Sequence, residues 1–106
     1  MARDYGLEEI LHEDLEDLAD LRTKTMFGGL VWMYRGAMLC AARHDGIIIR
    51  VGKTLEAWAL AFPDVVPMQS GKRKMGGWVR LGASASADDD LRRALLARAV
   101  QQIETF

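Results

Sequence analysis

Residues 26–51 read MFGGLVWMYRGAMLCAARHDGIIIRV, and this stretch decides the fold. Arg35-Gly36 and Asp45-Gly46 separate three apolar runs, which lie at residues 26–34, 37–43 and 47–51. An Asp-Gly step between apolar runs is a strong hairpin signal, because the tight turn needs positive φ at its central positions. The stretch therefore predicts a three-stranded antiparallel meander.

Helices are predicted before and after this meander in the sequence. Leucine and isoleucine recur every three or four residues over Leu7–Leu21 with acids in the gaps, which is typical of an amphipathic helix. The other predicted elements are a helix at 55–62, strands at 65–69 and 75–81, and a helix at 88–103. We therefore predict one α+β domain over residues 1–106, a two-layer fold with an antiparallel sheet and the order α-β-β-β-α-β-β-α.

Composition and charge limit the class of protein. The chain has 106 residues and a net charge of −1, which argues against a general polyanion binder. The charge is uneven, because residues 1–20 hold eight acids and one base whereas residues 21–87 hold ten bases and three acids. Cys40 is the only cysteine, and no segment resembles a signal peptide or a membrane span. We expect a cytoplasmic protein.

The predicted strands are apolar on both faces. A sheet covered on one side should alternate apolar and polar residues, and residues 26–34 do not. The predicted helices suffice for one face, so an apolar patch would remain, and such patches mark interaction sites. We predict a homodimer through this face, with Leu30, Trp32 and Tyr34 at the interface. Helices that wrap both faces are the alternative.

Catalytic chemistry has little support. Cys40 and His44 are four residues apart and would allow a thiolate with its base, but the apolar residues around Cys40 favour a packed core thiol. The two histidines are far apart, and carboxylates cluster only in the first helix, so no metal site or hydrolytic triad is predicted. We expect a protein that is not an enzyme and has no cofactor, with a thiol enzyme using Cys40 as the remote alternative.

A basic loop near the last strand offers a second kind of site. Lys72, Arg73 and Lys74, followed by Arg80, combine with a neighbouring tryptophan into a candidate contact for an anion or a nucleic acid, to which Arg50 would add. Bases beside an outer strand also protect a sheet edge from pairing with another chain, and this interpretation is the stronger one.

Gly28 and Gly29 interrupt the first predicted strand at a cost in backbone entropy. We expect a bulge or bend there, where the first helix, a neighbouring backbone or a partner comes too close for a Cβ atom.

Several segments together resemble the N-terminal domain of the TfoX/Sxy family, whose members are regulators linked to natural competence and DNA uptake in bacteria. They are Thr25-Met26-Phe27-Gly28-Gly29, Gly36-Ala37-Met38, Asp45-Gly46, the helix around Trp58, and Met75-Gly76-Gly77-Trp78. The resemblance covers about residues 20–104 and implies a secretion-chaperone-like two-layer fold with the same order of elements.

The resemblance also implies a role. It points to a small non-enzymatic regulatory domain that acts by protein–protein contact, with the two glycine pairs at Gly28-Gly29 and Gly76-Gly77, together with Met26 and Phe27, as a structural signature and contact surface. Full-length competence regulators carry a second, helical C-terminal domain. This sequence stops at Phe106, so the resemblance implies a standalone N-terminal domain.

Overall fold

The predicted meander forms the centre of the sheet in the computed structural model, which describes residues 3–26 and 28–105. Its middle strand runs antiparallel to the strands on either side. Arg43 pairs with Gly46 across the second turn, where Gly46 takes a φ of 126°. The hairpin predicted from Asp45-Gly46 is therefore confirmed.

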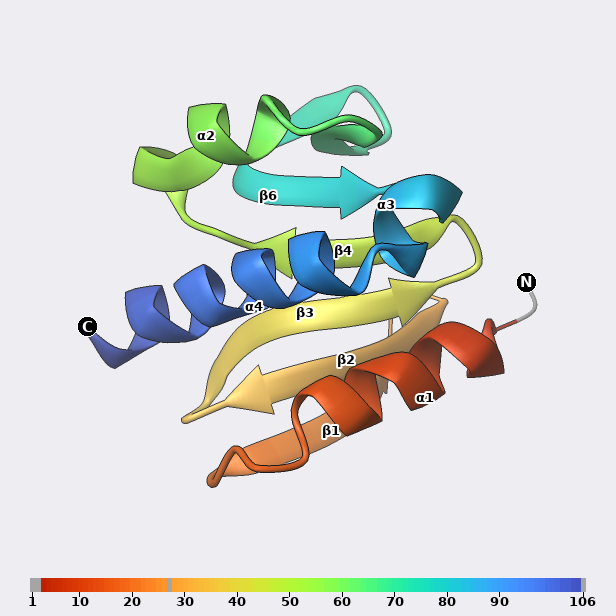
Figure 1. The fold of residues 1–106 in the computed structure, drawn as a ribbon, viewed down its shortest axis with the longest axis vertical. Helices are drawn as coiled ribbons and strands as arrows, with labels where there is room; N and C mark the ends of the chain where they lie inside the picture. The colour runs from red at the N-terminus through yellow and green to blue at the C-terminus, as the bar shows by residue number, and fades with distance from the viewer. Residues whose placement is uncertain (1–2, 27, 106) are drawn as a thin grey trace.

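The described residues form one six-stranded sheet with helices packed on it. In chain order the elements are α1 (Tyr5–Asp14), β1 (Leu21–Met26), β2 (Gly29–Tyr34), β3 (Ala37–Arg43), β4 (Gly46–Arg50), the 3-10 turn η1 (Lys53–Leu55), α2 (Glu56–Leu60), β5 (Val65–Ser70), β6 (Arg73–Leu81), α3 (Ala83–Ala87) and α4 (Asp89–Glu104). The strand order across the sheet is β1-β2-β3-β4-β6-β5, and all neighbours are antiparallel. Helices α1 and α4 cross the same face (Figure 1). The predicted α+β class and order of elements are confirmed, and the structure adds β1 and α3.

The first helix is shorter than predicted. The prediction ran over Leu7–Leu21, but α1 ends at Asp14, and Asp20 takes a φ of 59°, which no regular helix allows. Leu15 is nevertheless buried, and Leu18 packs against the same core. The leucine spacing was misleading because a turn can present side chains to a core much as a helix does.

The single strand predicted over residues 26–34 is two strands joined by a turn. Gly28 takes a φ of 75° in this turn, and Met26 pairs with Gly29 across it. Phe27 lies outside the described residues. The weak point in the apolar run is thus a hairpin, and the added strand β1 forms one edge of the sheet.

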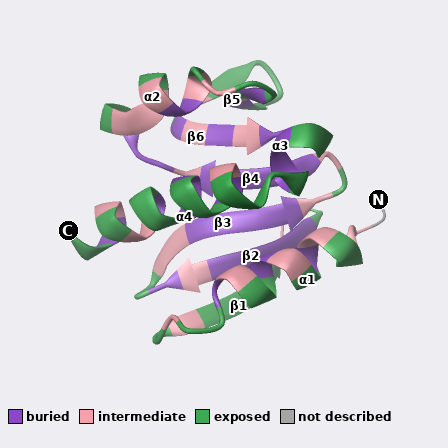
Figure 2. Cartoon of the chain, in the orientation of Figure 1, coloured by how far each residue is buried: buried purple, intermediate pink, exposed green. Residues whose placement is uncertain are grey.

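The helices share one hydrophobic core with one face of the sheet. Leu11, Ala59, Ala85 and Leu95, one from each α-helix, belong to the same buried cluster, and each is at most 2% exposed. The central strands β2 to β4 are buried along most of their length, whereas the outer sides of the helices are exposed (Figure 2). None of the described helices is long and apolar enough to cross a membrane.

The C-terminal half follows its predicted elements closely. Helix α2 lies within the predicted 55–62 segment, and β5, which contains Pro67, is the second edge of the sheet. Strand β6 begins at Arg73, two residues before the predicted start at Met75. Between the last predicted strand and the last predicted helix, the structure adds α3, a single short turn of helix.

A buried ion pair ties the helix layer together. The side chains of Asp14 on α1 and Arg92 on α4 are 2% and 3% exposed, and Arg92 Nη2 lies 3.2 Å from Asp14 Oδ1. Arg92 also donates to the Ser86 carbonyl at 2.8 Å and to Asp89 at 2.9 Å. The hydrogen bond to Asp14 raises the pKa of Arg92 and outweighs the lowering effect of burial. The ends of α1, α3 and α4 are held by this one cation.

Candidate interaction surface

The predicted interface residues lie in the core. Leu30, Trp32 and Tyr34 are 8%, 0% and 3% exposed and belong to the cluster under the helices. The Trp32 ring packs edge-on against His12 at 5.1 Å, and the Tyr34 hydroxyl donates to Glu104 at 2.7 Å. The predicted interface is therefore wrong in its residues, because strand alternation separates two faces without telling which one the helices cover.

The opposite face of the sheet carries a second apolar cluster, here called the methionine face. It consists of Val31, Ala41, Ile48 and Met68, with Met26, Met33, Met38, Met75 and Trp78 packed against them. Five of the six methionines of the chain are in it. All its members lie on strands, so no helix that the structure describes contributes to it. Methionine is flexible and polarizable, and it is common at surfaces that adapt to a partner.

Cations share this face. Residues directly opposite each other on antiparallel strands project to the same side of a sheet. The register pairs Arg22 with Met33, Lys24 with Val31, Arg80 with Ile48 and Arg50 with Trp78. The name face cations is used below for Arg22, Lys24, Arg50 and Arg80, together with two more. These are Arg43, which lines a hollow of this face, and Arg73, which lies two residues before Met75 on β6.

Acids lie on the helices and in the loops. The six described strands contain seven arginines and lysines and not one aspartate or glutamate. Asp45, in the β3–β4 turn, is the acid bound to this region, with its carboxylate 3.1 Å from Arg43 Nε. Arg80 donates to the Asp45 carbonyl at 3.1 Å. The uneven charge along the sequence thus corresponds to a basic sheet and acidic helices and loops.

A hollow of about 120 Å³ opens on the methionine face. It is lined by Met38, Ala41, Arg43, Ile48, Met68, Ser70, Met75 and Trp78. Sites for small metabolites are usually on the order of 300–1,000 Å³, so this hollow is too small for a whole ligand of that kind. Its size suits one large apolar side chain of a bound segment, with Arg43 at its wall.

The predicted basic loop lies at one end of the same sheet. Lys72 is in the β5–β6 turn, and Arg73 and Lys74 begin β6 opposite Ser70 and Gln69. All three bases are exposed, and the pairing strand β5 is a sheet edge. Their position therefore suits both contact with an anion and protection of the edge.

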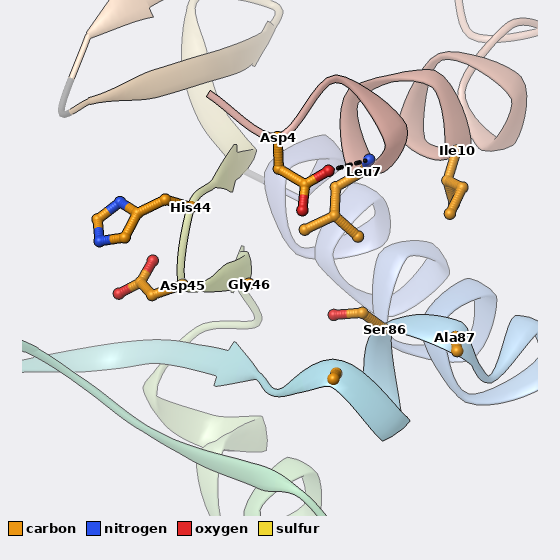
Figure 3. A pocket seen from close by; sticks show the side chains of 9 residues that line it. Asp4, Leu7, Ile10, His44, Asp45, Gly46, Ser86 and Ala87 are labelled. Atoms are coloured by element: carbon orange, nitrogen blue, oxygen red, sulfur yellow. Dashed lines mark hydrogen bonds between the residues drawn. The ribbon is translucent and has the colours of Figure 1, made fainter. Parts of the chain in front are cut away.

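A larger hollow, of about 330 Å³, lies between the start of α1, the β3–β4 turn and α3 (Figure 3). The His44 ring and the Asp45 carboxylate point away from Leu7 and Ser86 in this view. Asp4 accepts from the Leu7 backbone N–H at 3.1 Å and caps α1, and the Ser86 hydroxyl donates to a backbone carbonyl. The polar groups here hold local structure and do not converge on one point.

The thiol interpretation fails on burial. Cys40 is 0% exposed beneath the helices, and burial raises the pKa of its thiol far above the ordinary value. His44 is exposed in the turn beyond the strand. The pair therefore lacks the thiolate that a nucleophile needs. Within residues 3–26 and 28–105, no three His, Cys, Asp or Glu side chains are grouped as metal ligands would be.

The two glycine pairs have different tasks. A Cβ atom on Gly29 would lie 2.1 Å from the Ala42 carbonyl oxygen, so the neighbouring backbone comes too close for any side chain. Gly76 and Gly77 lie where the β5–β6 register shifts, and the Gly77 N–H donates to Glu56 at 2.7 Å. Both pairs shape the sheet, and the expected bend and close approach at the first pair are present.

The methionine face was not predicted, although the sequence carries a signal for it. Met26, Met33, Met38, Met68 and Met75 all fall in predicted strands or at their ends, and no predicted helix contains one. The predicted basic site included Lys72, Arg73, Lys74, Arg80 and Arg50, but not Arg22, Lys24 or Arg43. Placing both sets on one side of the sheet required the register, above all that of β1.

A protein-family model matches most of the chain. The family is described as TfoX N-terminal domain, and the match covers residues 13–103. No curated protein matches the sequence, and no solved structure matches it. The matched residues include every strand, and hence the whole methionine face.

Proposed function

We propose that this chain, which belongs to the TfoX N-terminal domain family, is a regulatory domain and binds a protein partner through the methionine face. The family supports the regulatory role. The choice of surface rests on one observation, which is an apolar cluster to which no described helix contributes, with cations beside it. An apolar centre with a polar rim is the usual anatomy of a protein interface.

A genetic experiment tests this proposal. The gene is deleted in its native host and restored as wild type, as Arg22→Glu/Lys24→Glu on the methionine face, or as Lys53→Glu/Arg98→Glu outside it. All four bases are exposed, so both double variants make the same charge change at the surface. We expect wild type and the second variant to restore the transcript profile, and the first to fail. A deletion without effect on transcripts, or full rescue by the first variant, would refute the proposal. Fractionation of the same cells tests the expected cytoplasmic location.

The homodimer stays a prediction. In a two-fold dimer the same patch meets itself, so the face cations of one copy would approach those of the other. Like charges brought together oppose association, most strongly at low salt. Light scattering after size exclusion decides the matter: a dimer that strengthens with added salt supports it, and a monomer at high concentration excludes it.

Direct nucleic-acid binding through the β5–β6 turn is the second candidate. It is supported by the exposed Lys72, Arg73 and Lys74, for which no ion pair is present among the described residues. Such binding must weaken steeply with salt because counterions are released. A mobility-shift assay at low salt with DNA and RNA tests it. The candidate fails if nothing shifts, or if alanine at all three positions changes nothing.

A further inference from the structure

The cations and the hollow of the methionine face together define the chemistry of a partner. We infer that the methionine face binds an acidic segment of another protein, which inserts one aromatic or long aliphatic side chain into the 120 Å³ hollow. This inference rests on the proposed function, because it takes the same face as the contact surface and names what occupies it.

Charge complementarity supports the acidic character. Among the described residues, Arg22, Lys24 and Arg73 of the face cations take part in no ion pair. The strands on which they lie contain no carboxylate that would compete with a ligand. A partner rich in Asp and Glu would meet cations along β1 and at the start of β6, on either side of the apolar centre. Charges placed in this way select the sign of the partner and speed its encounter.

The hollow supports a single apolar anchor. Met38, Met68 and Met75 line it together with Trp78, and these side chains leave only Arg43 and Ser70 as polar lining groups. Anchor residues that fill a desolvated pocket near the centre of an interface supply most of its binding energy. Flexible methionines let one pocket accept anchors of different shape. We therefore expect the face to tolerate several anchors and to reject a segment without one.

A protein segment fits this surface better than a nucleic acid. Single-stranded nucleic acids are held by bases stacked on several aromatic rings along a basic groove. Among the residues that the structure describes, Trp78 is the one aromatic ring of the methionine face, and methionines occupy most of its other large positions. A second copy of the chain fits less well, because its own sheet has the same sign of charge.

The direct test measures the binding of synthetic peptides to the full chain by fluorescence anisotropy. The probe is a labelled 15-residue peptide of glutamate and glutamine with one central phenylalanine or leucine. One control peptide has lysine for every glutamate, and another has alanine for the central residue. We expect the acidic anchored peptide to bind at least tenfold more tightly than either control, and its affinity to fall as salt is added.

Matched variants of the protein locate the binding site. Arg22→Glu/Lys24→Glu should weaken the acidic peptide at least tenfold, and Lys53→Glu/Arg98→Glu less than twofold. Ser70→Trp, which would fill the hollow from its exposed rim, should abolish the difference between the anchored and alanine peptides. Gln69→Trp, at the next residue and outside the hollow, should preserve it. Far-UV circular dichroism verifies that each variant is folded.

The results separate this inference from the proposed function. Equal binding of the lysine peptide, no binding of any peptide, or tighter binding of a single-stranded oligonucleotide that the same variants weaken would each overturn the inference. If the genetic experiment still distinguishes the two double variants, the contact surface stands and only the chemistry of the partner is wrong. If that experiment also fails, the proposed function falls with it.

Discussion

Replacing Gly29 by alanine tests a very close backbone approach between two strands of the sheet. The new Cβ would lie 2.1 Å from the Ala42 carbonyl oxygen, where ordinary contacts begin near 3.4 Å, so β2 and β3 must separate by more than about 1 Å. Loss of two ladder hydrogen bonds costs roughly 0.5–1.5 kcal/mol each, and the buried groups left unpaired add to this. We expect Gly29→Ala to lower the free energy of unfolding by about 3 kcal/mol.

Gly28→Ala is the matched control, because it makes the same chemical change one residue away. Apart from its neighbours in the chain, no described residue has an atom within 4 Å of the Cβ position at Gly28, so the cost is that of the left-handed backbone, about 1–2 kcal/mol. Urea unfolding followed by far-UV circular dichroism gives both values. Our interpretation of this turn is refuted if Gly29→Ala is no more destabilising than Gly28→Ala, since crowding by the neighbouring strand would then have no measurable effect.

Three further predictions concern the helix layer and the thiol beneath it. Asp14→Asn removes the charge that pairs with the buried Arg92 and should lower the free energy of unfolding in urea by about 3 kcal/mol. This is near the lower end of the cost of a broken buried pair, because Arg92 keeps the Ser86 carbonyl and Asp89 as acceptors. A loss below about 1 kcal/mol would contradict this prediction. The hydrogen bond to Glu104, and next to it burial, raises the pKa of the Tyr34 hydroxyl above its ordinary 10.0. The protonated hydroxyl therefore stabilises the fold below pH 10, and this contribution is lost as the pH rises through the raised pKa. Thermal unfolding should therefore show a steeper loss of stability above pH 10 in wild type than in Tyr34→Phe, and parallel curves would speak against it. Iodoacetamide at pH 8 should leave Cys40 unmodified in the folded protein and alkylate it in urea, as mass spectrometry would show; rapid labelling of the folded chain would disprove its burial.

The central hairpins could be predicted because their signals are local. Arg35-Gly36 and Asp45-Gly46 mark turns between apolar runs, and both glycines take a positive φ, Gly36 within its turn and Gly46 as the first residue of β4. The last helix was predictable for the same reason, since Asp88 caps it by accepting from the Leu91 N–H at 3.1 Å. Signals of this kind need no knowledge of the rest of the fold.

Strand β1 could not be predicted from its own residues. Leu21–Met26 reads LRTKTM, which is polar at most positions because the strand is an exposed sheet edge. The preceding leucines extended the predicted helix into it, and this concealed the hairpin at Gly28. Alternation through one uninterrupted strand would place Met26 on the face of Leu30, whereas the hairpin places it with Val31.

Which face of the sheet is left for a partner depends on long-range packing. Alternation along β2 correctly sets Leu30, Trp32 and Tyr34 apart from Val31 and Met33, but both sets are apolar. Which set the helices cover depends on how the whole chain crosses the sheet, and no local residue pattern records that. The surface therefore became identifiable only once the register placed Arg22 and Lys24 beside the second set.

The confinement of every acid to helices and loops makes the molecule a permanent electric dipole, although its net charge is only −1. A molecule with such a dipole turns in the electric field of a charged partner before the two make contact. A negatively charged partner would therefore meet the sheet side first, and dissolved salt would remove that advantage. The same asymmetry should let the protein adsorb at neutral pH to both cation-exchange and anion-exchange resins, in opposite orientations.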